Sequence, residues 1–456
     1  MKSINPATEE LIRDYDQLDW SELDEKLETA DERFEEWREQ SLDHRQSLMR
    51  EAADVLEENE DEYAETMTRE MGKPIAESRS EVEKCAWVCR YYSENAREHL
   101  QDRQIATMPD AETYVKYQPL GVVFAIMPWN YPFWQVFRFA APSLTAGNVG
   151  VLSHAPNVPG CAEAIEDVFE EAGFPEGAFT NLFIDNETSA DVISDDRVKA
   201  VTLTGSERAG RAVASQAGEN LKKTVLELGG SDPFVVLDDA DVEFAAEQAV
   251  KSRTLNSGQS CIAAKRMIVH EDVYDEFLEL FVEKMEELEV GDPEMETVDI
   301  GPQAREDLME DLHDQVERSV EEGAKVLVGG EPLDRDGYFY PPTVLTDVQE
   351  DAAARCEEVF GPVAPVIEVE DEDEALEVAN GVELGLGASV YTGDRERGRR
   401  FAEAFEAGAG FVNQFVKSDP RVPFGGIKKS GYGRELSSEG IREFVNRKTV
   451  WIQTEE

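Results

Sequence analysis

Apolar residues recur every three or four positions through the first hundred residues, and this spacing predicts amphipathic helices. Three helices are expected, at residues 21–40, 44–71 and 75–99, and Gly72-Lys73-Pro74 separates the last two. Residues 113–117 then alternate as in an exposed strand, and a turn is predicted just before them at Met108-Pro109-Asp110.

From Gly121 onward the pattern changes to short apolar runs that alternate with helical stretches. Continuous apolar runs fit strands that are buried on both faces, and the intervening helices connect them in parallel. Strands are predicted at residues 122–126, 149–152, 180–184, 198–203, 224–228 and 234–237, and helices at 157–172, 188–194 and 208–217. The pattern predicts a doubly wound parallel sheet, whose ligands lie at the carboxyl ends of the strands.

A second series of strands and helices occupies residues 231 to 419. It contains a helix from Asp241 to about Leu255, a strand from Arg266 to His270, a helix from Val273 to Glu289 and a strand near Tyr391. The chain ends in a further strand-like run at residues 449–452. Together the two series predict an α/β protein with two or three domains.

The charge of the chain is strongly unbalanced, because 99 Asp and Glu residues face 44 Lys and Arg residues and give a net charge of −55. The acidic residues are spread along the whole length, which indicates a solvated acidic surface. Such a surface repels itself in dilute salt, but the Debye length falls to about 3 Å at 1 M salt. The composition therefore indicates a protein from a halophile, and it argues against nucleic-acid or anionic-membrane partners.

The five cysteines are few and irregularly spaced. Cys85 and Cys89 are four residues apart in a helical pattern, but no second pair completes a zinc site, so core packing is preferred and no metal is expected. An odd number without a disulfide framework is typical of a reducing cytoplasm. The N-terminus has no apolar signal core, and prolines and polar residues break the apolar region 120–152, so no membrane span is expected.

One loop, Asn256-Ser257-Gly258-Gln259-Ser260-Cys261, places a single thiol after a glycine-containing turn. A cysteine in such a loop can be partly exposed, and backbone N–H groups can face whatever bonds to its sulfur. Those conditions favour a nucleophilic thiolate. The alternative is a small buried thiol that only fills the core.

Two other loops suit catalysis. Pro128-Trp129-Asn130-Tyr131-Pro132 presents a carboxamide between two prolines, although a rigid turn with a buried Trp is the alternative. Glu227 ends an apolar strand just before Gly229-Gly230. A carboxylate there is costly to bury unless it is paired or used in function.

Two further loops suit a cofactor. Gly205 and Ser206 follow a strand and open a helix that contains Gly210, and backbone N–H groups at a helix start can bind a phosphate. This loop lacks the two closely spaced glycines of the common dinucleotide motif. Glu358 and Phe360 could hold a ribose and stack on a ring, whereas a solvated turn is the alternative.

These loops, in this order, resemble the aldehyde dehydrogenase superfamily, and the resemblance runs from Asn5 to Trp451. Its most specific pieces are the cysteine loop at 256–261, Glu227-Leu228-Gly229-Gly230 and Pro423-Phe424-Gly425-Gly426-Ile427-Lys428. The ending that starts at Gly431-Tyr432-Gly433-Arg434-Glu435-Leu436 is most similar to the NAD(P)-dependent succinate-semialdehyde dehydrogenase branch.

The resemblance implies an α/β fold in three parts. These are a Rossmann-like dinucleotide-binding domain of residues 1–99 and 120–229, an α/β catalytic domain of residues 230–429, and a small oligomerisation arm of residues 100–119 and 430–456. A homodimer or homotetramer and a small-molecule aldehyde substrate are implied as well.

The resemblance also implies the catalytic roles. Cys261 attacks the aldehyde and forms a thiohemiacetal and then a thioester, while the Asn130 amide and the Cys261 N–H stabilise the oxyanion. Glu227 activates the water that hydrolyses the thioester. Contacts to the cofactor, NAD or NADP, are expected from Trp129, Ser153, Gly205, Ser206, Gly210, Glu358 and Phe360.

Two departures from the family pattern affect cofactor and substrate. Ser153 replaces the usual lysine beside the adenosine ribose, and Pro156 stands where NAD-specific members often have a glutamate. The choice between NAD and NADP is therefore open, and we expect both to be accepted.

For succinate semialdehyde, Arg138 and Ser418 match two of the residues that bind its carboxylate, but the second arginine of the branch falls near Leu255. Candidates to replace it are Arg253, Lys417 and Arg421. A general aliphatic or other semialdehyde dehydrogenase is the alternative, and a non-catalytic structural relative is a third interpretation.

Overall fold

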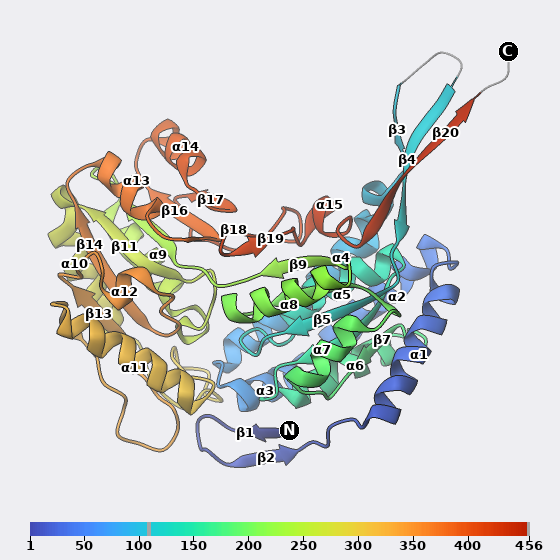
Figure 1. The fold of residues 1–456 in the computed structure, drawn as a ribbon. Coiled ribbons are helices and arrows are strands. Elements are labelled where there is room, and N and C mark those ends of the chain that lie inside the picture. The colour runs from blue at the N-terminus through green and yellow to red at the C-terminus, as the bar shows by residue number, and fades with distance from the viewer. Residues whose placement is uncertain (107–110, 454–456) are drawn as a thin grey trace.

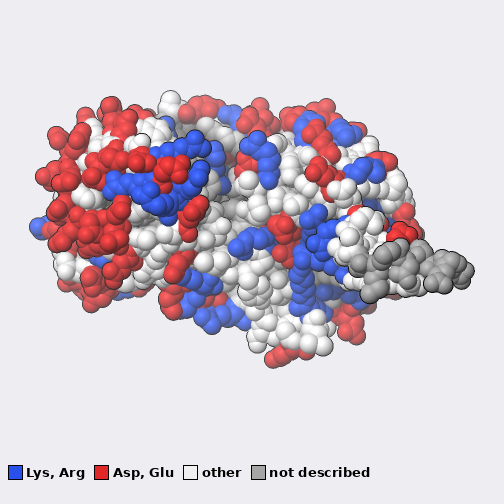
Figure 2. Space-filling view, turned by 90° about the horizontal axis from the view of Figure 1, so that it is seen from above, with Lys and Arg blue, Asp and Glu red and all other residues white. Residues whose placement is uncertain are grey.

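The structure is a computed structural model that describes residues 1–106 and 111–453, so the turn predicted at Met108-Pro109-Asp110 lies outside the described residues. Figure 1 shows two α/β lobes and a ribbon of strands that projects away from them. In Figure 2 acidic side chains are densest at the left end, whereas the middle of this face is mostly uncharged and carries groups of basic side chains.

A six-stranded sheet forms the centre of the first lobe, with the order β19-β9-β8-β5-β6-β7. Every neighbouring pair in it is parallel except β19 with β9. The strands are β5 (Val122–Met127), β6 (Val149–His154), β7 (Phe179–Asn181), β8 (Val198–Thr204), β9 (Lys223–Glu227) and β19 (Gly431–Tyr432). The chain runs outward from β5 to β7 and then returns to β8 on the other side, so β5 and β8 border the crevice where such sheets bind ligands.

Eight helices of the described chain surround this sheet. They are α1 (Trp20–Trp37), α2 (Leu42–Glu58), α3 (Glu60–Met71), α4 (Ile75–Leu100), α5 (Trp134–Ala146), α6 (Pro159–Glu171), α7 (Asn186–Ser194) and α8 (Glu207–Glu219). The single helix predicted for 44–71 is wrong, because the chain leaves helical geometry at Asn59, with φ −113° and ψ 22°. The Asn59 side chain donates to the carbonyl of Val55 and ends α2 there.

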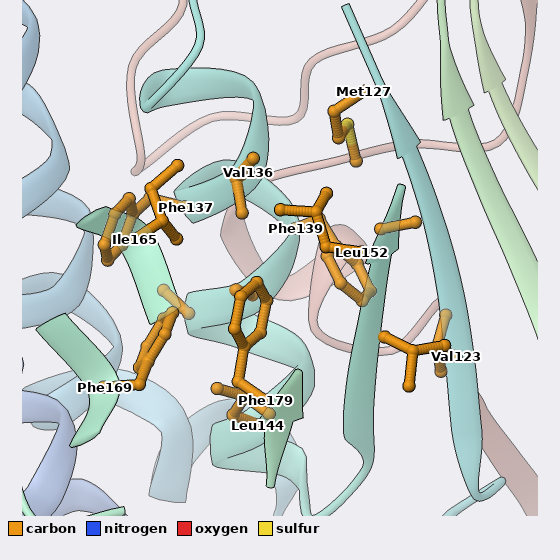
Figure 3. Packing of buried hydrophobic residues seen from close by; sticks show 14 of the residues in the cluster. Val123, Met127, Val136, Phe137, Phe139, Leu144, Leu152, Ile165, Phe169 and Phe179 are labelled. Carbon is orange, nitrogen blue, oxygen red and sulfur yellow. The ribbon is translucent and has the colours of Figure 1, made fainter. Parts of the chain in front are cut away.

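Helix α5 was not predicted, since it has no polar face. All its residues are buried, and Pro142 lies inside it. Its aromatic side chains pack into the main core of the first lobe, which Figure 3 shows from close by. The ring centroids of Phe137 and Phe169 are 5.2 Å apart, and those of Phe169 and Phe179 are 4.7 Å apart. Cys85 and Cys89 are buried in the same core, which confirms their assignment to packing.

The second lobe contains a seven-stranded sheet with the order β12-β13-β14-β11-β10-β16-β17, in which only β12 is antiparallel to its neighbour. Its strands are β10 (Asp232–Val236), β11 (Ala264–His270), β12 (Lys325–Val328), β13 (Thr343–Thr346), β14 (Val363–Val369), β16 (Gly387–Tyr391) and β17 (Ala409–Val412). Its helices are α9 (Val242–Thr254), α10 (Glu271–Glu286), α11 (Glu306–Glu321), α12 (Ala353–Cys356), α13 (Glu372–Asn380) and α14 (Arg395–Ala404). The prediction of parallel α/β sheets is confirmed.

The projecting ribbon consists of β3 (Arg103–Gln104), β4 (Ala111–Pro119) and β20 (Val445–Gln453), all antiparallel. Trp451 and Ile452 on β20 are about half exposed, at 50% and 45%. The smaller elements are β1 (Lys2–Ile4), β2 (Leu11–Asp14), β15 (Leu384–Gly385), β18 (Ile427–Lys428) and α15 (Ser437–Gly440). None of the described helices has both the length and the apolar character needed to cross a bilayer.

Candidate active site

The loop before Cys261 has an unusual backbone. After α9, a short 3₁₀ turn, η1 (Leu255–Gly258), contains three successive left-handed residues: Asn256 at φ 55°, Ser257 at φ 54° and Gly258 at φ 76°. Non-glycine residues reach this region only at a cost, of order 1–3 kcal/mol each, that the surroundings must offset. A conformation of this kind is expected where a side chain must be presented to a ligand.

Contacts from distant segments hold this turn in place. The Glu77 carboxylate on α4 accepts a hydrogen bond from the Asn256 N–H at 2.7 Å, and the Ser257 hydroxyl accepts one from the Gly301 N–H at 2.9 Å. A Cβ on Gly258 would lie 2.2 Å from the carbonyl oxygen of Gly361. The turn is therefore fixed on three sides, and glycine is required at its end.

Asn130 lies beside the same loop. The Asn256 amide donates to the Asn130 carbonyl at 2.7 Å and to the Gln259 carbonyl at 3.1 Å. The Asn130 side-chain amide donates to the Gln259 carbonyl at 3.1 Å. These bonds tie the first lobe's β5 loop to the thiol loop, so the structure brings together the predicted nucleophile and the predicted oxyanion donor.

Cys261 is half-buried and lies in the walls of two cavities. The first, of about 300 Å³, has Tyr131, Trp134, Phe415 and Phe424 in its wall, and we call it the aromatic cavity. The second, of about 250 Å³, lies at the carboxyl ends of β5, β8 and β9, and we call it the strand-end cavity. Burial raises the pKa of the Cys261 thiol to about 11, although the positive charges of Lys265 and Arg138 act in the opposite direction.

Glu227 is the last residue of β9 and lines the strand-end cavity together with Cys261. Its side chain is buried, and neither carboxylate oxygen accepts a hydrogen bond from any described residue. Burial and the nearby Glu435 raise its pKa well above the usual value, although Arg138 opposes this. A Cβ on Gly425 would lie 2.6 Å from a Glu227 oxygen, so glycine leaves room for this carboxylate.

Five of the predicted cofactor residues line the strand-end cavity: Trp129, Gly205, Ser206, Glu358 and Phe360. The Trp129 and Phe360 rings meet edge to face with centroids 5.8 Å apart. Ser206 caps α8 by accepting from the Ala209 N–H at 3.3 Å, so the helix start faces this cavity.

The Glu358 carboxylate reaches across to the end of β9. It accepts from the Gly230 N–H at 2.9 Å and lies 3.8 Å from the Lys265 ammonium. A Cβ on Gly229 would lie 2.2 Å from a Glu358 oxygen, so only glycine permits this approach. Burial raises the pKa of Glu358, and Lys265 opposes this increase.

The other two predicted cofactor residues do not line either cavity. Gly210 lies within α8 and faces Leu228, whose methyl carbons would be 2.6 and 2.7 Å from an added Cβ. The absence of a side chain at Gly210 thus lets α8 pack closely against Leu228, which follows β9. Ser153 is buried on β6, and its hydroxyl lies 3.4 Å from that of Ser189.

Both predicted substrate residues, Arg138 and Ser418, line the aromatic cavity. Arg138 forms a buried ion pair with Glu435, and its guanidinium carbon lies 4.7 Å from the centre of the Phe424 ring. Ser418 accepts a hydrogen bond from the ammonium of Lys84 on α4 at 2.8 Å. Sequence reasoning missed Lys84, because within α4 it is one charged residue among many.

The candidates for the missing second arginine have different positions. Leu255 lines the aromatic cavity as an apolar residue, and Lys417 lies exposed at its rim. Arg253 is buried outside the cavity and donates to the carbonyls of Gly258 and Val359 at 2.8 and 3.4 Å. Arg421 is exposed and forms an ion pair with Asp419 at 2.6 Å, so neither arginine supplies the missing contact.

The Cys261 thiol, the Asn130 amide and the Glu227 carboxylate, which accepts no hydrogen bond from a described residue, thus all line the strand-end cavity. Cys261 also lines the aromatic cavity. The aldehyde dehydrogenase family matches residues 1–450, and the chain belongs to that family. A curated relative from Synechocystis, named a probable succinate-semialdehyde dehydrogenase [NADP(+)], is 51% identical over 450 residues, which cover 99% of each chain. Succinate-semialdehyde dehydrogenase [NADP(+)] 1 of Mycobacterium bovis is 49% identical over 452 residues, again 99% of each.

A solved structure of a relative has the same fold as this chain. The succinic semialdehyde dehydrogenase of Streptococcus pyogenes, in complex with NADP+ as the cofactor, matches with a TM-score of 0.97 and 39% identity over 99% of each chain. The predicted aldehyde dehydrogenase fold is confirmed.

Proposed function

We propose that this protein is an NADP+-dependent succinate-semialdehyde dehydrogenase, which converts the aldehyde group to a carboxylate. One observation supports it most: Cys261 lies between a cavity that carries cationic groups and a cavity built at strand ends. The choice of succinate semialdehyde as the substrate and NADP+ as the cofactor follows the names of the relatives from Synechocystis and Mycobacterium. Three residues, Cys261, Glu227 and Asn130, have the chemistry that the reaction needs.

Cys261 forms the carbon–sulfur bond. Its thiol must lose a proton first, and Lys265 and Arg138 favour the thiolate against the effect of burial. The oxyanion that develops on the aldehyde oxygen accepts hydrogen bonds from the Cys261 N–H and the Asn130 amide. One such donor is typically worth about 3–4 kcal/mol in the transition state.

Glu227 completes the reaction as a general base. After the oxidation step a thioester links the substrate to Cys261, and Glu227 removes a proton from the water that attacks it. A carboxylate with a raised pKa is a better base near neutral pH than an ordinary one. Because no described group binds its oxygens, Glu227 is free to take this proton.

The strand-end cavity fits a dinucleotide. Gly229 leaves room for the Glu358 carboxylate, which is offered to ribose hydroxyls, and the start of α8 offers N–H groups to a phosphate. When bound, NADP+ supplies the electron acceptor for the oxidation.

The cofactor preference gives a test on its own. Ser153 and Pro156 carry no charge, so neither attracts nor repels a 2′-phosphate, and a preference for NADP+ comes from other contacts. If the adenosine end of the cofactor extends past the strand-end cavity to the end of β6, Ser153→Lys should lower KM for NADP+ more than KM for NAD+, because the added charge then meets the extra phosphate. A substitution that improves both cofactors equally would contradict this placement of Ser153.

The substrate is tested with a panel of aldehydes and both cofactors. We expect kcat/KM for succinate semialdehyde with NADP+ to exceed that for butanal at least tenfold. A second candidate, a general aliphatic aldehyde dehydrogenase, is favoured by the aromatic wall and by Leu255. A preference for butanal would establish that candidate instead.

We also propose the predicted division of the chain: residues 1–99 and 120–229 bind the dinucleotide, 230–429 carry the nucleophile, and 100–119 with 430–456 form an oligomerisation arm. The two sheets and the projecting ribbon support it, and exposed apolar side chains on β20 suit pairing in a homodimer or homotetramer. Within the last segment, β19 pairs with β9 of the first sheet.

Five free cysteines support a cytoplasmic location. The net charge supports a halophilic source, although the organisms of the two curated relatives do not indicate one.

A further inference from the structure

Lys84 is a half-buried lysine in the wall of the aromatic cavity. Its ammonium donates to the Ser418 hydroxyl at 2.8 Å and lies 4.4 Å from the centre of the Trp134 ring. None of the carboxylates in the described parts of the chain forms an ion pair with it. A neutral hydroxyl and a ring face compensate only part of the charge of a desolvated ammonium.

The other cations near this cavity already have partners. Arg138 is paired with Glu435, and Lys73 with Glu81, both inside the protein. Lys265 donates to the carbonyls of Ser260, Cys261 and Ala263. Lys417 is exposed at the rim, where water solvates its ammonium. Lys84 is thus the partly desolvated cation of this cavity whose charge is left for a ligand.

We infer that Lys84, together with Ser418, binds the distal carboxylate of the substrate and selects a semialdehyde over an uncharged aldehyde. The inference rests on the proposed function and goes beyond it by assigning the missing cation to α4 instead of the loop around Leu255. Ser418 supplies a hydroxyl donor to the same carboxylate once Lys84 turns from it to the ligand. Arg138, which is paired with Glu435, then contributes a positive field from its place in the cavity wall.

The surroundings of Lys84 make its charge sensitive to pH. Burial, followed by the charge of Arg138, lowers its pKa to about 8, while Cys85, Glu81 and Asp419 act in the opposite direction. The cavity wall also carries Glu77, whose pKa burial raises to about 7, and the exposed Lys417. Below pH 8 Lys84 is charged and attracts a carboxylate, and above pH 8 it is neutral in the free enzyme and attracts it less. An arginine contact alone would stay constant, because guanidinium remains charged at these pH values.

The first experiment compares Lys84→Met and Lys84→Arg with the unchanged enzyme, using succinate semialdehyde and butanal. Lys84→Met should reduce the ratio of the two kcat/KM values about tenfold or more, through KM for the semialdehyde, and Lys84→Arg should restore most of it. Lys222→Met is the matched control, since Lys222 is also half-buried with a pKa lowered by burial but lines neither cavity. Equal losses for both aldehydes in Lys84→Met would overturn the assignment.

A second measurement needs no variant. The same ratio in the unchanged enzyme should fall up to about tenfold between pH 7 and pH 9, because the free enzyme loses the Lys84 charge over this interval. Taking the ratio cancels the effect of pH on Cys261 and Glu227, which both substrates share. A ratio that stays constant from pH 6 to pH 10 refutes the role of Lys84. An unchanged enzyme that prefers butanal at every pH refutes the proposed function itself, so the two failures are distinguishable.

Discussion

At the scale of single residues, the state of the Cys261 thiol is the first property that can be measured. With a pKa of about 11 in the ligand-free protein, only a small fraction is thiolate at neutral pH. Its alkylation by iodoacetamide should therefore accelerate about tenfold per pH unit from pH 7 to pH 10, because only the thiolate reacts. Mass spectrometry of the peptide separates this thiol from the exposed Cys356. A rate that levels off below pH 8 would show that the thiol is activated without ligands.

The separate tasks of thiol and carboxylate give a second prediction. Cys261→Ala should abolish both turnover and any initial burst of reduced cofactor. Glu227→Gln should permit the first oxidation but stall thioester hydrolysis, which gives a burst of about one equivalent per site followed by slow turnover. Stopped-flow absorbance of the reduced cofactor measures both. Normal turnover by Glu227→Gln would show that another group is the base.

The residues of the site were predictable to different degrees. Cys261, Glu227 and Asn130 stand in loops whose sequence already carries their chemistry, and the structure places all three around one junction. Lys84 was not predictable, since its partner Ser418 is 334 positions away and α4 has charged residues along its whole length. Arg253 was a reasonable candidate from its position near Leu255, but its side chain turns toward backbone carbonyls.

At the scale of elements, the turn η1 depends on glycine at its last position. Gly258→Ala places a Cβ 2.2 Å from a backbone oxygen at a residue with φ 76°, and backbone cannot move aside as a flexible side chain does. We expect the free energy of unfolding to fall by about 2 kcal/mol or more, with a larger loss of kcat. Urea denaturation and steady-state kinetics measure the two effects.

Gly218→Ala is the control for this change. Gly218 lies in α8 with open space around it, so an added methyl should be neutral or stabilise by up to about 1 kcal/mol. If Gly258→Ala and Gly218→Ala changed the free energy of unfolding equally, the requirement for glycine in the strained turn η1 would be refuted.

The elements show where periodicity succeeds and where it fails. The predicted strands from 122 to 237 overlap β5 to β10, because buried parallel strands are short and continuously apolar. Helix α5 escaped prediction, since a helix buried on all sides has no polar stripe to mark its period. The division between α2 and α3 at Asn59 was also missed, because the apolar spacing continues across it.

At the scale of the whole molecule, the net charge of −55 dominates behaviour in solution. Acidic side chains are dense at one end of the face in Figure 2, and mutual repulsion weakens the folded state where salt is low. The midpoint of thermal unfolding should rise between 50 mM and 2 M KCl, because salt screens this repulsion. Differential scanning fluorimetry measures it, and sucrose of equal osmolality, which does not screen charge, should raise it less. Equal midpoints at both salt concentrations would contradict the halophilic interpretation.

The position of one sulfur in the walls of two cavities affects the order in which products can leave. Apart from Gln135 and Cys261, the two walls share no residue among those that line them. Under the proposed function, an acyl group bonded to this sulfur would extend into the aromatic cavity and leave the strand-end cavity open. The reduced coenzyme and the acid would then leave through different cavities, so neither release would have to precede the other. An enzyme built on this plan can exchange its coenzyme while the acyl group is still attached.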